Sequence, residues 1–141
     1  DLSVNQIDHF VEEGILSGVP SSISKIPDYS DSSLDPITRG KAYLDANCAY
    51  CHRQGGTANA NGLYINWDYE GEGIHTGAFK IPTNFNAPGF QYDIVPGNPD
   101  ESILLYRMTQ TRAPAVMPQL SRSINDDEGI EIIREYISNL E

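Results

Sequence analysis

The chain has 141 residues, of which 39% are hydrophobic and 21% charged, which predicts one globular domain with a single sizeable core. The formal net charge of −11 disfavours nucleic acid and anionic membranes as partners, and no apolar run reaches the length of a transmembrane helix. The chain begins at Asp1 without a signal peptide, so we expect a mature or excised protein. As an isolated domain it is expected to be a monomer.

The N-terminal part is expected to form a helix followed by a linker. In residues 4–17, apolar side chains recur near helical spacing, which predicts a short amphipathic helix ending at Gly18. The Ser-, Pro- and Asp-rich stretch that follows predicts a surface connection. We therefore expect residues 1–35 to form a helix and linker arm packed on the core, and residues 36–141 to form the main domain.

A second helix is predicted from Pro36 to about Asn47, because Asp35 is a favourable N-cap and proline suits the first helical position. Residues 54–97 then show no regular period. They are rich in Gly, Asn and Pro and hold seven of the thirteen aromatic residues. A long segment of this kind usually has a function, and we expect it to wrap a ligand.

Two further helices are predicted in the C-terminal third. Asn98 and Pro99 form a start signal, followed by an inward stripe of Ile103, Leu104 and Met108. The last helix should begin at a capping box of Asn125 and Glu128. Its apolar face is predicted to consist of Ile130, Ile133, Ile137 and Leu140. Strand signals are weak, so we predict an all-α domain with long loops.

The stretch CAYCH at residues 48–52 carries the most chemical information. It contains the only two cysteines of the chain, and His52 follows the second. A disulfide or redox dithiol of this spacing is typical of thioredoxin-like folds, whose strand–helix–strand context is not visible here. A zinc site would need further ligands, such as His9 or His75, which are far away in the sequence.

Covalent attachment of haem accounts for every position of this motif. Each thiol can add to one vinyl group of the porphyrin, which carries the next residue, His52, under the ring, where its imidazole can bind iron. Haem iron often takes a methionine as its opposite ligand. Met117 lies in an irregular stretch and is followed by proline, whereas Met108 lies in a predicted amphipathic helix and reads as a core residue.

We therefore favour Met117 as the second iron ligand, with His9 and His75 as competing ligands. The stretch GKAYLDANCAYCH, the Met-Pro pair at 117–118 and the closing GIEIIREYISNL resemble a class I c-type cytochrome over roughly residues 36–141. In that family a glycine and a neighbouring apolar residue of the first helix pack against an aromatic residue of the last. The matching residues here are Gly40, Tyr43 or Leu44 on one side and Ile133, Tyr136 and Ile137 on the other.

A narrower resemblance extends through the N-terminal arm. QIDHFVEEGILSG, VPGNPDESILLYRM and MPQL are similar to mono-haem cytochrome c domains appended to large secreted multi-domain bacterial proteins. This implies that residues 1–35 belong to the domain. The chain departs from the family's usual Met-Pro-Pro-Leu-Gly at Gln119 and Ser121, which affects the shape of the loop more than its ligand.

The resemblance implies one covalent haem c, held by Cys48, Cys51, His52 and Met117, in the periplasm or outside a bacterial cell. The haem propionates would need donors, and Arg112, Trp67 and Tyr64 are the candidates. The carbonyl of Pro82 or Pro88 would orient His52. Because two ligands fill the iron coordination, the expected role is outer-sphere electron transfer and not enzymatic catalysis. The alternative is a haem peroxidase or ligand sensor with a weak or absent sixth ligand.

The expected partner is a redox protein or a fused oxidoreductase module. Residues 39–53 and 102–125 together hold six basic residues against a single acidic one, and each segment carries an iron ligand. One interpretation is a cationic rim that attracts carboxylates of the partner; the other is that the arginines balance the propionates. The acidic residues Asp68, Glu70 and Glu72 could attract a cation such as calcium or could simply be solvated.

Overall fold

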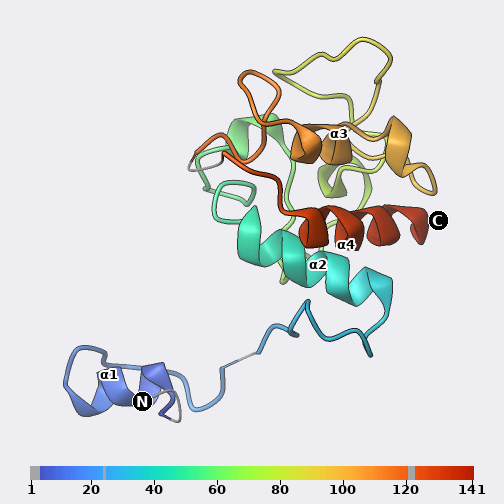
Figure 1. Ribbon diagram of the computed structural model, residues 1–141. Helices are drawn as coiled ribbons and strands as arrows, with labels where there is room; N and C mark the ends of the chain where they lie inside the picture. Colours follow the sequence, from blue (N-terminus) through green and yellow to red (C-terminus); the bar gives the residue numbers. More distant parts are fainter. Residues whose placement is uncertain (1–3, 24, 121–122) are drawn as a thin grey trace.

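The computed structural model describes residues 4–23, 25–120 and 123–141 (Figure 1). These residues form four α-helices: α1 (Gln6–Glu12), α2 (Pro36–Asn47), α3 (Ile103–Thr109) and α4 (Asp127–Ser138). Three short 3₁₀ helices lie between α2 and α3: η1 (Asn59–Asn61), η2 (Gly73–Thr76) and η3 (Pro99–Glu101). The described residues form no β-strand, only two isolated bridges, so the all-α class is confirmed.

Helix α2 begins where the sequence predicts. The Asp35 side chain accepts a hydrogen bond from the Thr38 N–H at 2.9 Å, and Pro36 occupies the first helical position. Cys48 is the C-cap residue, and its N–H still donates to the carbonyl of Leu44. The cysteine motif therefore starts directly at the end of a well-capped helix.

Helices α2 and α4 pack closely side by side (Figure 1). A Cβ atom on Gly40 would overlap the Tyr136 side chain, and one on Gly129 would overlap the tip of the Tyr43 ring. Each helix thus receives an aromatic ring of the other at a glycine, as the resemblance implies for Gly40 and Tyr136. Ile133, also on α4, is fully buried beside this contact.

The N-cap of α4 is Asp126 and not the predicted Asn125. Asp126 Oδ1 accepts from the Gly129 N–H at 3.0 Å, while its Oδ2 accepts from the Tyr43 hydroxyl at 2.8 Å. Asn125 instead donates through Nδ2 to the carbonyl of Thr109 at 3.3 Å. The correction has a physical reason, because Asp126 is the residue that can cap α4 and bind α2 with the same carboxylate.

Helix α3 is shorter than the sequence predicts. Pro99 starts the 3₁₀ helix η3, and the α-helix begins only at Ile103, after an extended Ser102. The fully buried Ser102 hydroxyl accepts from the Val95 N–H at 2.9 Å and donates to the Asn98 carbonyl at 3.0 Å. These bonds hold Ser102 in the extended conformation that separates the two helices, while Ile103 and Met108 are buried as expected.

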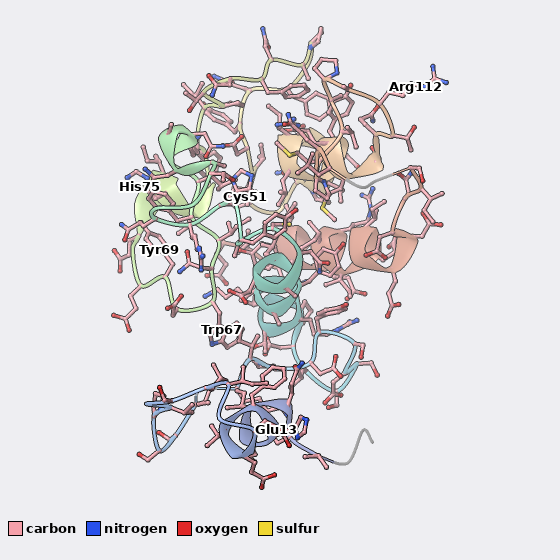
Figure 2. The ribbon with its side chains drawn as sticks, turned by 90° about the vertical axis from the view of Figure 1, so that its left-hand side faces the viewer. Glu13, Cys51, Trp67, Tyr69, His75 and Arg112 are labelled. Carbon is pink, nitrogen blue, oxygen red and sulfur yellow. The ribbon has the colours of Figure 1, made fainter. Side chains whose placement is uncertain are left out.

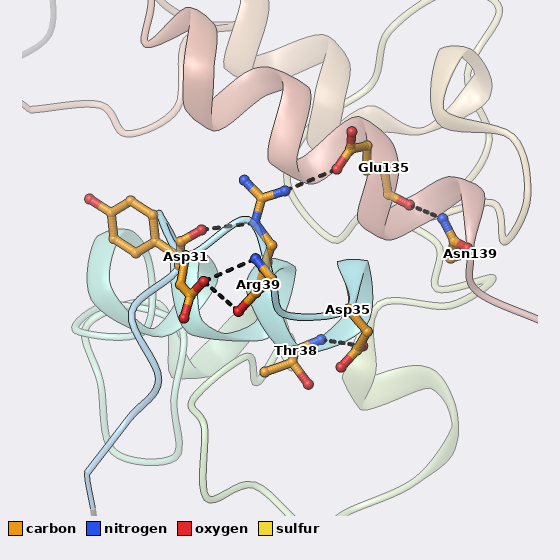
Figure 3. Close-up of polar contacts among 8 residues, drawn as sticks. Asp31, Asp35, Thr38, Arg39, Glu135 and Asn139 are labelled. Carbon is orange, nitrogen blue, oxygen red and sulfur yellow. Dashed lines mark hydrogen bonds and ion pairs between the residues drawn. The ribbon is translucent and has the colours of Figure 1, made fainter.

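The N-terminal arm contacts the core through one turn. Helix α1 ends at Glu12, earlier than expected, has no buried residue and stands apart from the other helices (Figure 1). Nearer the core, the ring of Tyr29 meets that of Tyr43 edge-on at 5.3 Å. The Tyr29 carbonyl accepts from Arg39 Nε at 3.0 Å, and Arg39 also donates to Glu135 on α4 (Figure 3). The arm is thus attached through Tyr29 and not through α1.

No helix among the described ranges has the length and apolar character needed to cross a bilayer.

Candidate functional site

The cysteine motif opens onto a cavity of about 740 Å³, a volume within the usual range for ligand pockets. Its walls come from the end of α2, from α3 and from loops. The part formed by cavity-lining residues between 57 and 94 and between 114 and 124 is called the loop wall below. Residues that lie far apart in the sequence meet here: Cys48, Cys51, His52, Met108 and Met117.

The backbone after α2 folds back on itself at the motif. The carbonyl of Cys48 accepts from the N–H groups of both Cys51 and His52, at 3.1 and 3.0 Å. The Cys51 carbonyl accepts from Ala58, and the His52 carbonyl accepts from Ile65 at 3.0 Å. These bonds hold both half-buried cysteines and the histidine on one wall of the cavity, as the motif predicts.

His52 has a buried ring nitrogen, Nδ1, that makes no hydrogen bond. The backbone hydrogen bond that contributes to the pKa of His52 is with Leu63, and not with the expected Pro82 or Pro88. Burial lowers the pKa of His52 below its usual value; Asp93 opposes this shift and Arg107 adds to it. Burial therefore favours the neutral imidazole, the form that binds a metal, and an unpartnered buried nitrogen is the kind of atom that a ligand can explain.

The two methionines reach the cavity from different surroundings. Met108 lies on α3 with 6% of its surface exposed and belongs to the main hydrophobic core. Met117 is half-buried in the loop between α3 and α4, and its N–H donates to the carbonyl of Arg107 at 3.1 Å. Both methionines line the cavity, so the choice of Met117 as the iron ligand stays a prediction.

Charged side chains also line this cavity. Lys80 is only 6% exposed, and its Nζ pairs with Asp93 Oδ2 at 3.0 Å and donates to the Ile81 carbonyl at 3.2 Å. Arg107, on α3, is the second cation on the wall. Sequence reasoning gave neither residue a role, although Lys80 is the only Lys or Arg within residues 54–97, which was a usable signal.

The proposed propionate donors lie elsewhere, because Arg112, Trp67 and Tyr64 do not line the cavity. Arg112 is exposed, and Figure 2 shows it at the upper right edge of the molecule, away from Cys51. The backbone N–H of Trp67 donates to Asp45 Oδ1 at 2.8 Å. The Tyr64 ring stacks on His75, with centroids 5.3 Å apart, and these contacts hold both aromatic residues outside the cavity.

The remaining candidates also fall outside the cavity. His9 lies on the separate α1, and His75 is exposed and bonded through Nδ1 to the Gly62 carbonyl at 2.8 Å. Asp68, Glu70 and Glu72 are exposed. Within the part of the chain that the structure describes, no three His, Cys, Asp or Glu side chains gather in a way that could hold a metal ion.

The arginines of the basic segments 39–53 and 102–125 differ in their surroundings. Arg39 pairs with Glu135 at 3.2 Å and Arg107 is half-buried, whereas Arg53 and Arg112 are exposed. Ser121 and Arg122 lie outside the described residues. A continuous cationic rim around the cavity therefore stays a prediction.

Comparison with protein-family models, with curated proteins and with solved structures finds no match to this chain.

Proposed function

We propose that the protein is a mono-haem c-type cytochrome of class I that transfers electrons in the periplasm or outside a bacterial cell. One observation carries the proposal: the CAYCH motif and Met117, distant in the sequence, line the same cavity. Two thiols, a neutral imidazole and a thioether are the side chains that covalent haem with His–Met ligation requires.

The cavity residues have the chemical groups that a covalently attached haem needs. The thiols of Cys48 and Cys51 would each add across a vinyl double bond: a sulfur–carbon bond forms, the thiol hydrogen moves to the other vinyl carbon, and nothing leaves. His52 and Met117 would bind the iron. The carboxylates of the haem would meet the cationic side chain of Arg107, which takes the place of Arg112 in this proposal, because Lys80 is already paired with Asp93.

When bound, haem supplies one iron that takes an electron from a reduced partner protein and passes it to an oxidised one. The surrounding residues set the conditions for this transfer. His52 and Met117 would be the two protein ligands of the iron, and an iron held by two protein ligands disfavours peroxidase chemistry and gas sensing. Tyr50 and Leu120 line the cavity and are 53% and 73% exposed, so the cavity reaches the surface, where a partner can approach.

The test is the optical spectrum of the purified holoprotein, oxidised and reduced, for wild type, Met117→Ala and Met108→Leu. We expect haem that stays attached after denaturation and a low-spin ferric spectrum with the weak thioether-to-iron band. Met117→Ala should abolish this band and lower the reduction potential, because a methionine ligand raises it. Met108→Leu, a substitution of similar volume in the core, should retain the band.

Other spectra would contradict the proposal in defined ways. A band that survives in Met117→Ala and disappears in Met108→Leu would assign the second ligand to Met108. A high-spin wild type that binds carbon monoxide or cyanide readily would favour the peroxidase or sensor function. A haem released on denaturation would refute covalent attachment through Cys48 and Cys51.

A further inference from the structure

The side chain of Arg107 binds the loop that carries Met117. Its Nε donates to the Ala115 carbonyl at 3.0 Å, and its Nη2 donates to the Pro114 carbonyl at 3.2 Å. These two carbonyls belong to consecutive residues just before Met117. A guanidinium presents several N–H groups in a rigid fork, so it can hold two neighbouring carbonyls at once, which an ammonium group does less well.

The backbone of the same residue binds the other end of this short stretch. The Arg107 carbonyl accepts from the Met117 N–H at 3.1 Å. Between the two attachments Val116 is buried, with 6% of its surface exposed. One residue of α3 thus fixes the backbone on both sides of Val116 and determines where the Met117 side chain starts.

The guanidinium of Arg107 also contacts an aromatic ring. Its guanidinium carbon lies 4.2 Å from the centroid of Phe85, which belongs to the long segment between the cysteine motif and α3. Cation–π contact of this kind favours a fixed, partly desolvated guanidinium. Burial lowers the pKa of Arg107 and Asp93 opposes that shift. The side chain therefore connects α3, Phe85 and the Met117 loop.

We infer that Arg107 is a positioning residue that keeps the Met117 thioether at the iron against competing ligands. The inference rests on the proposed His52–Met117 ligation. A thioether is a neutral and soft ligand, so an added imidazole can displace it when the loop is free to move away. Two hydrogen bonds from a charged donor oppose that movement, and their loss should make displacement easier.

The experiment is a titration of the ferric holoprotein with imidazole, followed by loss of the thioether-to-iron band. Arg107→Met should bind imidazole about tenfold or more tightly than wild type, since it removes both hydrogen bonds to the loop. Arg107→Lys keeps the positive charge but not the fork, and should bind about three- to tenfold more tightly. Arg112→Met, which removes an exposed arginine of the same loop, is the matched control and should behave as wild type.

The outcomes separate this inference from the ligand assignment. Met117→Ala should bind imidazole most tightly of all; if it keeps the band and the wild-type affinity, the His52–Met117 ligation is refuted. If Met117→Ala behaves as expected while Arg107→Met and Arg107→Lys match wild type, the positioning role alone is refuted. If Arg107→Met fails to incorporate haem, Arg107→Lys decides. Wild-type affinity for imidazole in Arg107→Lys would show that a positive charge without the guanidinium fork suffices, and would refute the role of the fork.

Discussion

At the crossing of α2 and α4 the backbones approach so closely that Gly40 and Gly129 each receive an aromatic ring of the other helix. The loop wall of the cavity lacks regular structure over most of its length and depends on polar attachments, such as Lys80 to Asp93 and Arg107 to the Met117 loop. The crossing is therefore sensitive to side-chain volume. The loop wall is sensitive to the loss of single donors and charges.

This difference follows from what each region has available. Helices satisfy their own backbone groups, so their contact faces can be apolar and closely packed. Loop backbone near a cavity has carbonyl and N–H groups without a regular partner, and side chains must supply the missing hydrogen bonds. Substitutions in the two regions should consequently fail for different reasons.

The largest effect is expected from Lys80→Met in the loop wall. It leaves Asp93, whose side chain is only 14% exposed, without its cation, which should lower the free energy of unfolding by about 3–5 kcal/mol. Denaturant unfolding of the holoprotein measures this, and the double variant Lys80→Met/Asp93→Leu should recover most of the loss. Arg134→Ala breaks a pair with the exposed Asp100 and should cost at most about 1 kcal/mol. Equal losses for Lys80→Met and Arg134→Ala would refute the importance of the buried pair.

A slightly smaller effect is expected from Ile133→Ala at the helix crossing. Ile133 is fully buried, and truncation to alanine should cost about 2–5 kcal/mol through lost burial and the cavity that remains. Leu140→Ala, which truncates a half-buried side chain, is the control and should lower the free energy of unfolding clearly less. Denaturant unfolding measures this loss as well. Because Ile133 has no charged partner, we expect no second substitution to recover it in the way that Asp93→Leu recovers the loss in Lys80→Met.

The smallest of the three effects is expected from Gly40→Ala. The added methyl group meets the base of the Tyr136 side chain, which cannot swing away freely, so the helices must separate at a cost of about 1–3 kcal/mol. Lys41→Ala, at the neighbouring exposed position of α2, should change stability by less than about 0.5 kcal/mol. A stabilised Gly40→Ala protein, as helix propensity alone would give, would contradict the close approach.

The parts of the fold that were predictable depend on local signals. Asp35-Pro36 defines the start of α2, and the apolar period after residue 127 defines α4. The CAYCH motif pointed to the cavity because its chemistry is contained in five consecutive residues. Met117 could be chosen as a candidate ligand for a similar reason, because it is one of only two methionines and is followed by a proline.

What sequence reasoning missed depends on tertiary contacts. The choice of Asp126 over Asn125 as the cap of α4 is made by the Tyr43 hydroxyl, which comes from another helix. Lys80 and Arg107 become important only when the long loop segment folds back on α3. Arg112 is near Met117 in sequence, but the direction of its side chain is set by the path of the loop, and spacing does not encode this path.

The hydrogen bond from Asn125 Nδ2 to the Thr109 carbonyl has an evolutionary consequence. It joins the last residue of α3 to the chain just before α4, so the methionine-bearing loop leaves and returns at adjacent points. Once such ends are fixed, doubling the length of the intervening chain costs only about 0.6 kcal/mol. Related sequences could therefore lengthen, shorten or replace this loop while helices α2 and α4 stay unchanged.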